Sequence, residues 1–170
     1  MSRKAEIKSI NEDIVRRFAL IEGRLKGCSS PEVLLAELLE RVEEQFHVPF
    51  VWCSIITDEK NAQLIKKARS SPKLKGRLNL IGRELFEKIM TDGAGPLLVN
   101  SSLKPYFKLF PDGEKYFIKS MAIVPLQING GIIGCWISAD ARQDRYQPGM
   151  HTDILQKFAE FVSRRLSELS

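Results

Sequence analysis

The stretch from Ser120 to Asp140 constrains the fold of this chain more than any other. Two apolar runs flank Asn129-Gly130, which is the strongest short-range signal of a β-hairpin. Both faces of the hairpin are largely apolar, so we expect it to lie in a sheet that is covered on both sides. A two-residue loop predicts three cross-strand pairs: Val124 with Cys135, Ile123 with Trp136, and Pro125 with Gly134.

Strict alternation divides this hairpin into two faces. The first is small or aliphatic and suits the packing of helices; it contains Ser120, Ala122, Val124, Leu126, Ile133, Cys135, Ile137 and Ala139. The second mixes apolar and polar groups around a glycine; it contains Met121, Ile123, Pro125, Gln127, Ile132, Gly134, Trp136, Ser138 and Asp140. Ligand pockets are mostly apolar with a few placed polar groups, so the second face is the candidate for a site.

A candidate pocket follows from the second face and from the segment before the hairpin. We expect its walls to be Trp52, Ser54, Met121, Ile123, Trp136 and Ser138, with Asp140 and Lys104 at a polar end. Residues 103–119, the lid segment, concentrate aromatic side chains, and Tyr106, Phe107 and Phe110 would form the roof, with Tyr116 and Phe117 in the same segment. An equally good interpretation is that these aromatics close one end of the core.

An apolar seam predicts a helix over residues 3–26. Its members are spaced by three or four residues and repeat every eleven, and they are Ile7, Ile10, Ile14, Phe18, Ile21 and Leu25. An eleven-residue repeat suits a nearly straight helix seam rather than a heptad zipper. The partner of this seam is the chain's own last helix, a second subunit or both, and we expect a homodimer interface at these six residues.

The remaining elements follow from apolar periodicity and turn signals. Helices are predicted over residues 31–46, 83–90 and from about Met150 to the end of the chain. Strands are predicted over residues 50–57, 62–68 and 97–100, and residues 70–80 are expected to be irregular.

The net charge of +5 is unevenly distributed. No acidic residue occurs between Asn61 and Arg83, a stretch that carries Lys66, Lys67, Arg69, Lys73, Lys75, Arg77 and Arg83. Such a stretch predicts a surface for phosphate, an anionic ligand, an acidic partner or nucleic acid. The simpler interpretation, which we favour, is a solvated loop and strand edge where lysines discourage edge pairing.

The other compositional features are those of one ordinary globular domain. Cys28, Cys53 and Cys135 form no C-x-x-C pair, and two of them lie in apolar runs typical of buried free cysteine. His47 and His151 lie far apart, which disfavours a metal site. The N-terminus lacks the apolar core of a signal peptide and no run is long enough to span a membrane, so we expect a cytoplasmic protein.

The hairpin resembles that of GAF domains, a family of sensory α/β modules. The likeness rests on Ser120 to Leu126, on Asn129 to Gly134, on Asp140, on the Arg145-Tyr146 loop and on the terminal helix over residues 154–169. The chain is most similar to a bacterial GAF-related family of unknown function, which shares the Phe110-Pro111 step and an ending like Pro148-Gly149-Met150. The resemblance implies an α+β sandwich with a six-stranded antiparallel sheet, terminal helices on one face and a pocket on the other.

The chain departs from the GAF domains of known chemistry. The Asn-Lys-Phe-Asp-Glu signature of those that bind cyclic nucleotides is absent, and no cysteine lies in the loops that attach bilin in phytochromes. Free methionine sulfoxide reductases have loop cysteines, whereas Cys53 and Cys135 fall in predicted strands. The resemblance therefore implies no particular cofactor.

We expect a non-catalytic sensory or interaction domain that binds a small molecule and dimerises through its terminal helices. Residues 1–28 would be the dimerisation element and residues 29–170 the GAF-like domain. In such a dimer a ligand would act by shifting the helices, and the output would pass to a protein partner. The alternatives are a nucleic-acid-associated protein that uses the basic stretch Lys66–Arg83, and a redox enzyme of the sulfoxide reductase type.

Overall fold

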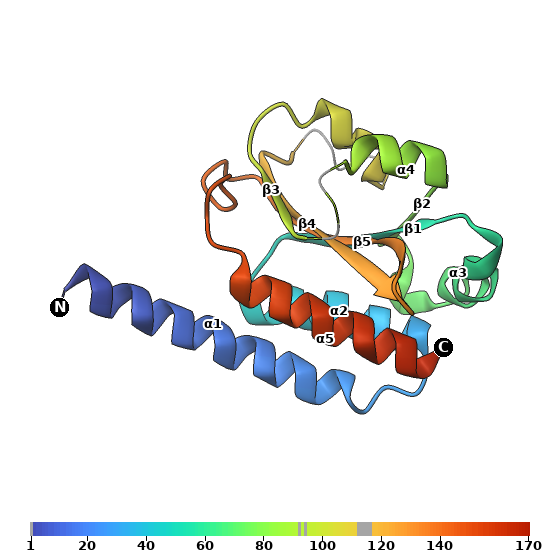
Figure 1. Ribbon diagram of the computed structural model, residues 1–170, viewed down its shortest axis with the longest axis horizontal. Coiled ribbons are helices and arrows are strands. Elements are labelled where there is room, and N and C mark those ends of the chain that lie inside the picture. Colours follow the sequence, from blue (N-terminus) through green and yellow to red (C-terminus); the bar gives the residue numbers. More distant parts are fainter. Residues whose placement is uncertain (1, 92, 94, 112–116) are drawn as a thin grey trace.

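The computed structural model describes residues 2–91, 93, 95–111 and 117–170, and it shows helices on both faces of a central sheet (Figure 1). The strands are β1 (Phe50–Ile56), β2 (Leu78–Ile81), β3 (Leu97–Val99), β4 (Ser120–Ile128) and β5 (Gly131–Asp140). One face is covered by α1 (Arg3–Leu25), α2 (Pro31–Phe46), α3 (Ala62–Arg69) and α5 (Asp153–Leu169). The other is covered by α4 (Arg83–Ile89) and the 3-10 helix η3 (Lys104–Leu109).

The sheet has five strands in the described part of the chain, in the order β2-β1-β5-β4-β3. β1 and β2 run parallel, and the other neighbours are antiparallel. The α+β class and the placement of the terminal helices on one face are therefore confirmed, whereas a sheet of six antiparallel strands is not. The sheet is mixed because β2 returns to the edge of β1 after a helical crossover.

That crossover is α3, and the prediction of a strand over residues 62–68 was wrong. Leu64 and Ala68 are buried and lie four residues apart, which places them on one side of a helix. The basic residues that follow cover the exposed side and the last turn, where cations are favoured by the helix dipole. The segment predicted as irregular contains the short 3-10 helix η2 (Pro72–Leu74) and the edge strand β2.

The β4–β5 hairpin has the predicted two-residue turn, with Asn129 and Gly130 at φ 50° and 82°. Ile128 pairs with Gly131 and Gln127 with Ile132, but Leu126 pairs with Gly134, so Ile133 has no cross-strand partner. This extra residue is a β-bulge.

The bulge shifts every pair beyond it by one residue. Val124 therefore pairs with Trp136, Ile123 with Ile137, and Pro125 with Cys135, in place of the three predicted pairs.

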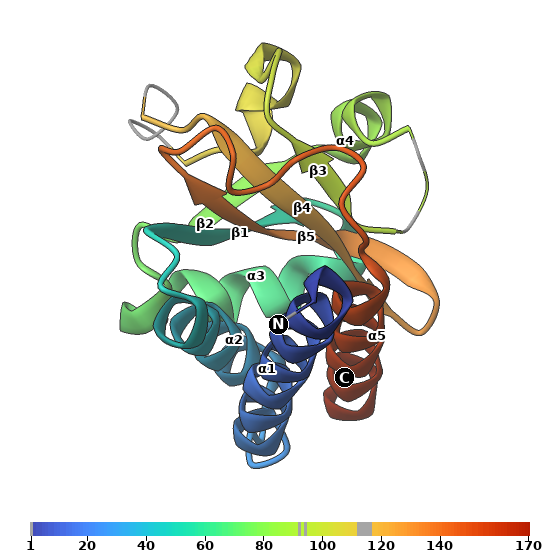
Figure 2. The ribbon, with the colours of Figure 1, turned by 90° about the vertical axis from the view of Figure 1, so that its left-hand side faces the viewer.

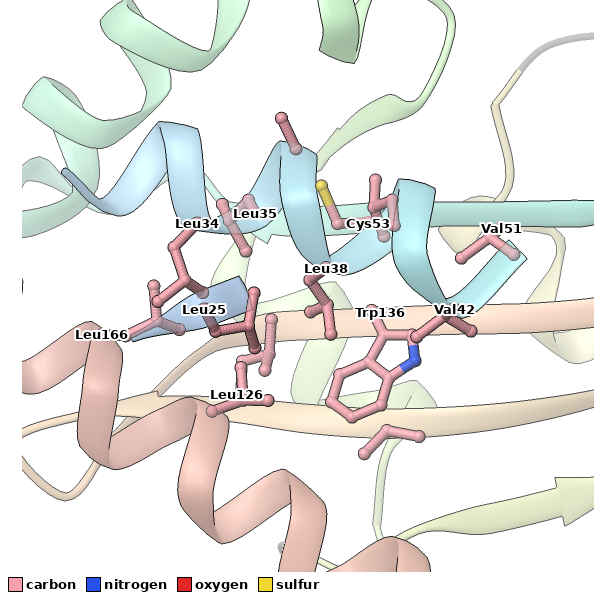
Figure 3. Packing of buried hydrophobic residues seen from close by; sticks show 14 of the residues in the cluster. Leu25, Leu34, Leu35, Leu38, Val42, Val51, Cys53, Leu126, Trp136 and Leu166 are labelled. Atoms are coloured by element: carbon pink, nitrogen blue, oxygen red, sulfur yellow. The ribbon is translucent and has the colours of Figure 1, made fainter. Parts of the chain in front are cut away.

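The shifted register exchanges the two faces of β5 beyond the bulge. Trp136 lies against the helices, and its ring meets Phe158 of α5 edge-on with centroids 5.8 Å apart. Figure 3 shows its indole beside Leu38 and Val42 of α2. Cys135, Ile137 and Ala139 point to the opposite face instead. The face predicted for β4 is correct, since Val124 and Leu126 meet the helices while Met121 and Ile123 do not.

The helix α1 lies outside α2 and α5, on the side away from the sheet (Figures 1 and 2). Phe18 is its central anchor, with ring centroids 4.3 Å from Phe158 of α5 and 4.8 Å from Phe46 of α2. Ile21 and Leu25 are fully buried beyond this anchor. The N-terminal half of α1 projects past the rest of the molecule (Figure 1).

The half of β4 beyond Ile123 is a sheet edge, because β3 pairs only with Met121 to Ile123. This edge is shielded. Pro125 has no N–H group to offer to another strand. The next outward amides, those of Gln127 and Asn129, donate to the Ser163 and Ser167 hydroxyls of α5, each at 2.9 Å. The edge therefore has few free donors for another strand.

Candidate functional site

The lid side of the sheet is filled by the chain's own side chains. Trp52 is 1% exposed, and its Nε1–H donates to the Leu109 carbonyl at 2.8 Å. The Phe110 ring lies 5.0 Å from Trp52 and 5.5 Å from Phe107, between centroids. Met121 and Ile123 are fully buried in the same cluster. These residues therefore lie together as predicted, but as a packed second core.

The outer aromatics of the lid segment divide between core and surface. Tyr106 packs at the margin of this second core, and Lys104 is exposed at the start of η3. Phe117 is 62% exposed, and Tyr116 lies outside the described residues.

Two of the predicted polar residues stabilise backbone segments. The Ser54 hydroxyl accepts from Asn79 Nδ2 at 2.8 Å, and the same amide donates to the Lys108 carbonyl at 2.9 Å. Asp140 accepts from the Arg142 amide at 3.0 Å and forms an ion pair with Arg145 at 3.3 Å. Ser54 thus holds Asn79 of β2, which in turn fastens the lid segment, and Asp140 orders the loop after β5.

Ser138 and Ser120 also hold the loop after β5 in place. Ser138 hydrogen-bonds the phenol of Tyr146, whose pKa is raised by burial. Arg145 extends this support across the sheet end by donating to the Phe46 carbonyl at 2.6 Å, at the end of α2. The Ser120 hydroxyl donates to the Arg142 carbonyl at 2.6 Å.

Trp136 cannot share a pocket with Trp52, which corrects the predicted site. It is 1% exposed on the helix side, whereas Trp52 is buried on the lid side. The cause is the bulge at Ile133, and the glycine beside it is the sequence signal that could have revealed the change of face.

The three cysteines are buried and unpaired. Burial raises the pKa of the Cys53 thiol to about 12, and it also raises the pKa of the Cys135 and Cys28 thiols. The thiolate is the reactive form of cysteine, so at neutral pH these thiols are inert. The described residues also contain no group of three or more His, Cys, Asp or Glu side chains placed to hold a metal ion.

A hollow of about 600 Å³ lies at the turn end of the hairpin, and none of the predicted pocket residues lines it. Residues from α2, η1 (Glu59–Asn61), α3, the hairpin and α5 form this hairpin-end hollow. They are Pro31, Glu32, Lys60, Asn61, Gln63, Leu64, Lys67, Ile128, Asn129, Gly131, Ile133, Leu169 and Ser170. Sequence reasoning missed it because it treated α3 as a strand.

Two of the seven basic side chains in the stretch Lys66–Arg83 form ion pairs. Arg77 is paired with Glu43, and Arg83 with Asp58 at 2.5 Å. Five exposed cations of α3, of η2 and of the residue after η2 form no ion pair within the described part of the chain: Lys66, Lys67, Arg69, Lys73 and Lys75. They leave a positive surface beside the hairpin-end hollow.

The apolar seam of α1 is divided between the core and the surface. Ile21 and Leu25 are fully buried within the chain, so they are not free to meet a second subunit. Ile7 and Ile10 are 50% and 59% exposed on the projecting half. A shallow hollow of about 540 Å³ runs along that half beside Ile7 and Val15.

Comparison with solved structures shows which known folds this one is similar to. The chain is similar to the free methionine-R-sulfoxide reductase of Neisseria meningitidis, solved with its substrate, with 15% identity, a TM-score of 0.61 and coverage of 89% of this chain and 87% of that one. It is also similar to the GAF domain of a phosphoenolpyruvate-protein phosphotransferase from Acinetobacter, with 14% identity, a TM-score of 0.58 and coverage of 99% and 95%. The corresponding domain from Coxiella burnetii gives 12% identity, a TM-score of 0.59 and coverage of 92% and 94%.

These similarities confirm a GAF-like fold and, at such low identity, carry no activity with them. A comparison with curated proteins found no significant match. In the described part of the chain, no helix is both long enough and apolar enough to cross a membrane. A family model described as "Protein of unknown function, DUF484" matches residues 4–169, and the chain therefore belongs to this family.

Proposed function

We propose that this protein is a non-catalytic GAF-like regulatory domain that forms a homodimer through the projecting half of α1 and responds to a small molecule. The observation that carries the proposal is the divided seam of α1. One continuous apolar pattern docks Phe18, Ile21 and Leu25 onto the chain's own helices and leaves Ile7 and Ile10 exposed. The exposed half requires a partner surface.

A second copy of the chain is the occupant that the charges of α1 favour. The projecting half carries Lys4 and Lys8 near its start and Glu12 farther along, whereas Asp13 already pairs with Arg16 and Arg17 of the same helix. In an antiparallel pair of these segments, unlike charges face each other while the isoleucines meet at the centre. The apolar stripe of α5 is already buried within the chain, so α1 alone would form the contact.

The non-catalytic part of the proposal rests on the burial and the raised pKa values of the cysteine thiols. The thiols of Cys53 and Cys135 are buried, and their pKa values are raised far above neutral. A redox cycle of the sulfoxide reductase type needs an accessible thiolate. A nucleic-acid role rests on the positive surface of α3 and η2 alone.

Native mass spectrometry and light scattering of the purified chain test the dimer. We expect a dimer at micromolar concentrations, and a monomer for the double variant Ile7→Lys/Ile10→Lys. Burial of a half-exposed isoleucine stabilises a contact by about 1 kcal/mol, so losing four per dimer raises the Kd about a thousandfold.

The matched control is Ala5→Lys/Ser9→Lys, which adds the same charges to exposed positions of α1 off the seam. This control should remain a dimer. A monomeric wild-type chain, or equal dissociation of both double variants, would refute the contact. Circular dichroism should show unchanged folding in all cases, since the four substituted positions are exposed.

A further inference from the structure

The hairpin-end hollow has the composition of a binding site and lies on the helix side of the sheet, away from the packed lid. Its floor is apolar, with Leu64 and Ile133 buried and Ile128 and Leu169 partly buried around them. Its volume of about 600 Å³ is within the range of small-molecule pockets. The walls come from five elements, so a ligand there would contact helices and sheet together.

Unlike charges line this hollow without neutralising one another. Lys60 and Lys67 stand on the side of η1 and α3, and Glu32 stands in the first turn of α2. None of the three forms an ion pair within 4.0 Å in the described part of the chain. Glu32 Oε2 is buried and has no hydrogen-bond partner there.

These charges define what a ligand must carry. A buried carboxylate oxygen without a donor is destabilising, and a cationic donor group on a ligand would satisfy it. The ammonium groups of Lys60 and Lys67 are exposed, and an anion bound in the hollow would form charge-assisted hydrogen bonds with them. A simple anion would be repelled by Glu32, and a simple cation by the lysines, so both charges must be on one molecule with an apolar body.

We propose that the hairpin-end hollow binds a free α-amino acid with an apolar side chain. Its carboxylate lies at Lys60 and Lys67, its ammonium group at Glu32, and its side chain on Leu64 and Ile133. A free amino acid is the simplest molecule that carries both charged groups together with an apolar side chain.

A ligand in the hollow would be linked to α1 through α5. The regulatory role of this link rests on the function proposed above. Leu169 of α5 lines the hollow, and Arg165 lies one helical turn before it. Arg165 Nη2 donates to the carbonyl of Cys28 at 2.7 Å and to that of Lys26 at 3.2 Å, directly after α1. A ligand that orders the end of α5 would therefore act on the segment that joins α1 to α2.

Amide chemical shifts and calorimetry with L-phenylalanine test the site. We expect shifts confined to the hollow, at Leu64, Asn129, Gly131 and Ile133. Two analogues separate the charges: 3-phenylpropionate lacks the ammonium group and 2-phenylethylamine lacks the carboxylate. Each should bind at least tenfold more weakly than L-phenylalanine. L-leucine and L-methionine extend the series to aliphatic side chains.

Two charge variants and their matched controls complete the test. Lys60→Gln/Lys67→Gln and Glu32→Gln should each weaken L-phenylalanine binding at least fivefold. Lys66→Gln/Lys73→Gln and Glu84→Gln remove the same charges from exposed positions outside the hollow, and binding should stay within twofold. No shift with any of the three amino acids, shifts at another surface, or equal binding of 3-phenylpropionate would overturn the proposal.

The monomeric variant of α1 keeps the two proposals separable. Ile7→Lys/Ile10→Lys changes residues far along the chain from the hollow, so L-phenylalanine should bind it as it binds the wild type. Loss of the dimer with intact binding would leave the site standing, and a dimer without binding would overturn only the site.

Discussion

Replacing Gly134 by alanine should destabilise the fold by about 4 kcal/mol, because the glycine is required where β5 bulges against β1. Gly134 has φ 149°, a conformation that residues with a side chain rarely adopt. A Cβ atom there would lie 2.1 Å from the Ser54 carbonyl oxygen and 3.0 Å from Ile55 Cα. Both atoms belong to the backbone of β1, which pairs with β5 in the middle of the sheet.

The magnitude follows from two contributions. The unfavourable φ costs about 1–3 kcal/mol. Relieving the contact moves one central strand by about 1 Å, and strain of this kind in a packed core costs a further 1–3 kcal/mol. The sum is a large part of the total of about 5–15 kcal/mol that stabilises a typical domain. We expect the thermal midpoint to fall by about 10 °C.

Urea and thermal denaturation followed by circular dichroism measure this loss. Gly131→Ala is the control on the same strand, since its Cβ would meet the Lys60 ammonium at 3.5 Å, an ordinary contact. The control should change stability by less than about 1 kcal/mol. A loss below about 1 kcal/mol for Gly134→Ala would show that β1 and β5 tolerate a side chain there, and it would refute the account of the bulge.

Two further predictions concern the thiols and the sheet edge. Burial raises the pKa of Cys53 from 9.0 to about 12. The contribution of this thiol to stability is therefore complete below pH 9 and is lost as the pH rises toward 12, by up to about 1.4 kcal/mol per pH unit. Urea midpoints on both sides of pH 9 should show a smaller decline in Cys53→Ala than in the wild type, and equal declines would contradict the assignment. Ser163→Ala/Ser167→Ala removes the acceptors of the Gln127 and Asn129 amides. The exposed Asn129 amide bonds to water instead, so the half-buried Gln127 amide sets the cost, and unfolding should require about 1–3 kcal/mol less. Light scattering should detect association through the β4 edge, and neither effect is expected for Ser9→Ala.

Local sequence patterns predicted the elements that depend on local physics. The helices α1 and α2 begin and end within a residue of their predicted bounds, because their apolar spacing is long and regular. The Asn129-Gly130 turn is also correct, since few other residue pairs adopt two positive φ angles readily. The GAF-like fold followed from the order of these elements.

The errors arise where a short segment allows two readings or where one residue changes a register. Residues 62–68 form a short segment in which a strand and a helix both fit, and the buried pair Leu64 and Ala68 decides for the helix. The faces of β5 were assigned by strict alternation, which a single extra residue reverses. Whether the seam of α1 meets its own chain or a second copy depends on tertiary packing, which no local pattern contains.

The bulge at Ile133 connects the fold to the proposed site. Ile133 is the residue that the bulge leaves without a cross-strand partner, and it lies on the floor of the hairpin-end hollow. Bulges commonly re-aim side chains beside binding sites. Here the same irregularity buries Trp136 beneath the helices, brings Gly134 against Ser54, and sits at the end of the hairpin where the hollow opens. We therefore expect the bulge to be a requirement of the site as much as of the sheet.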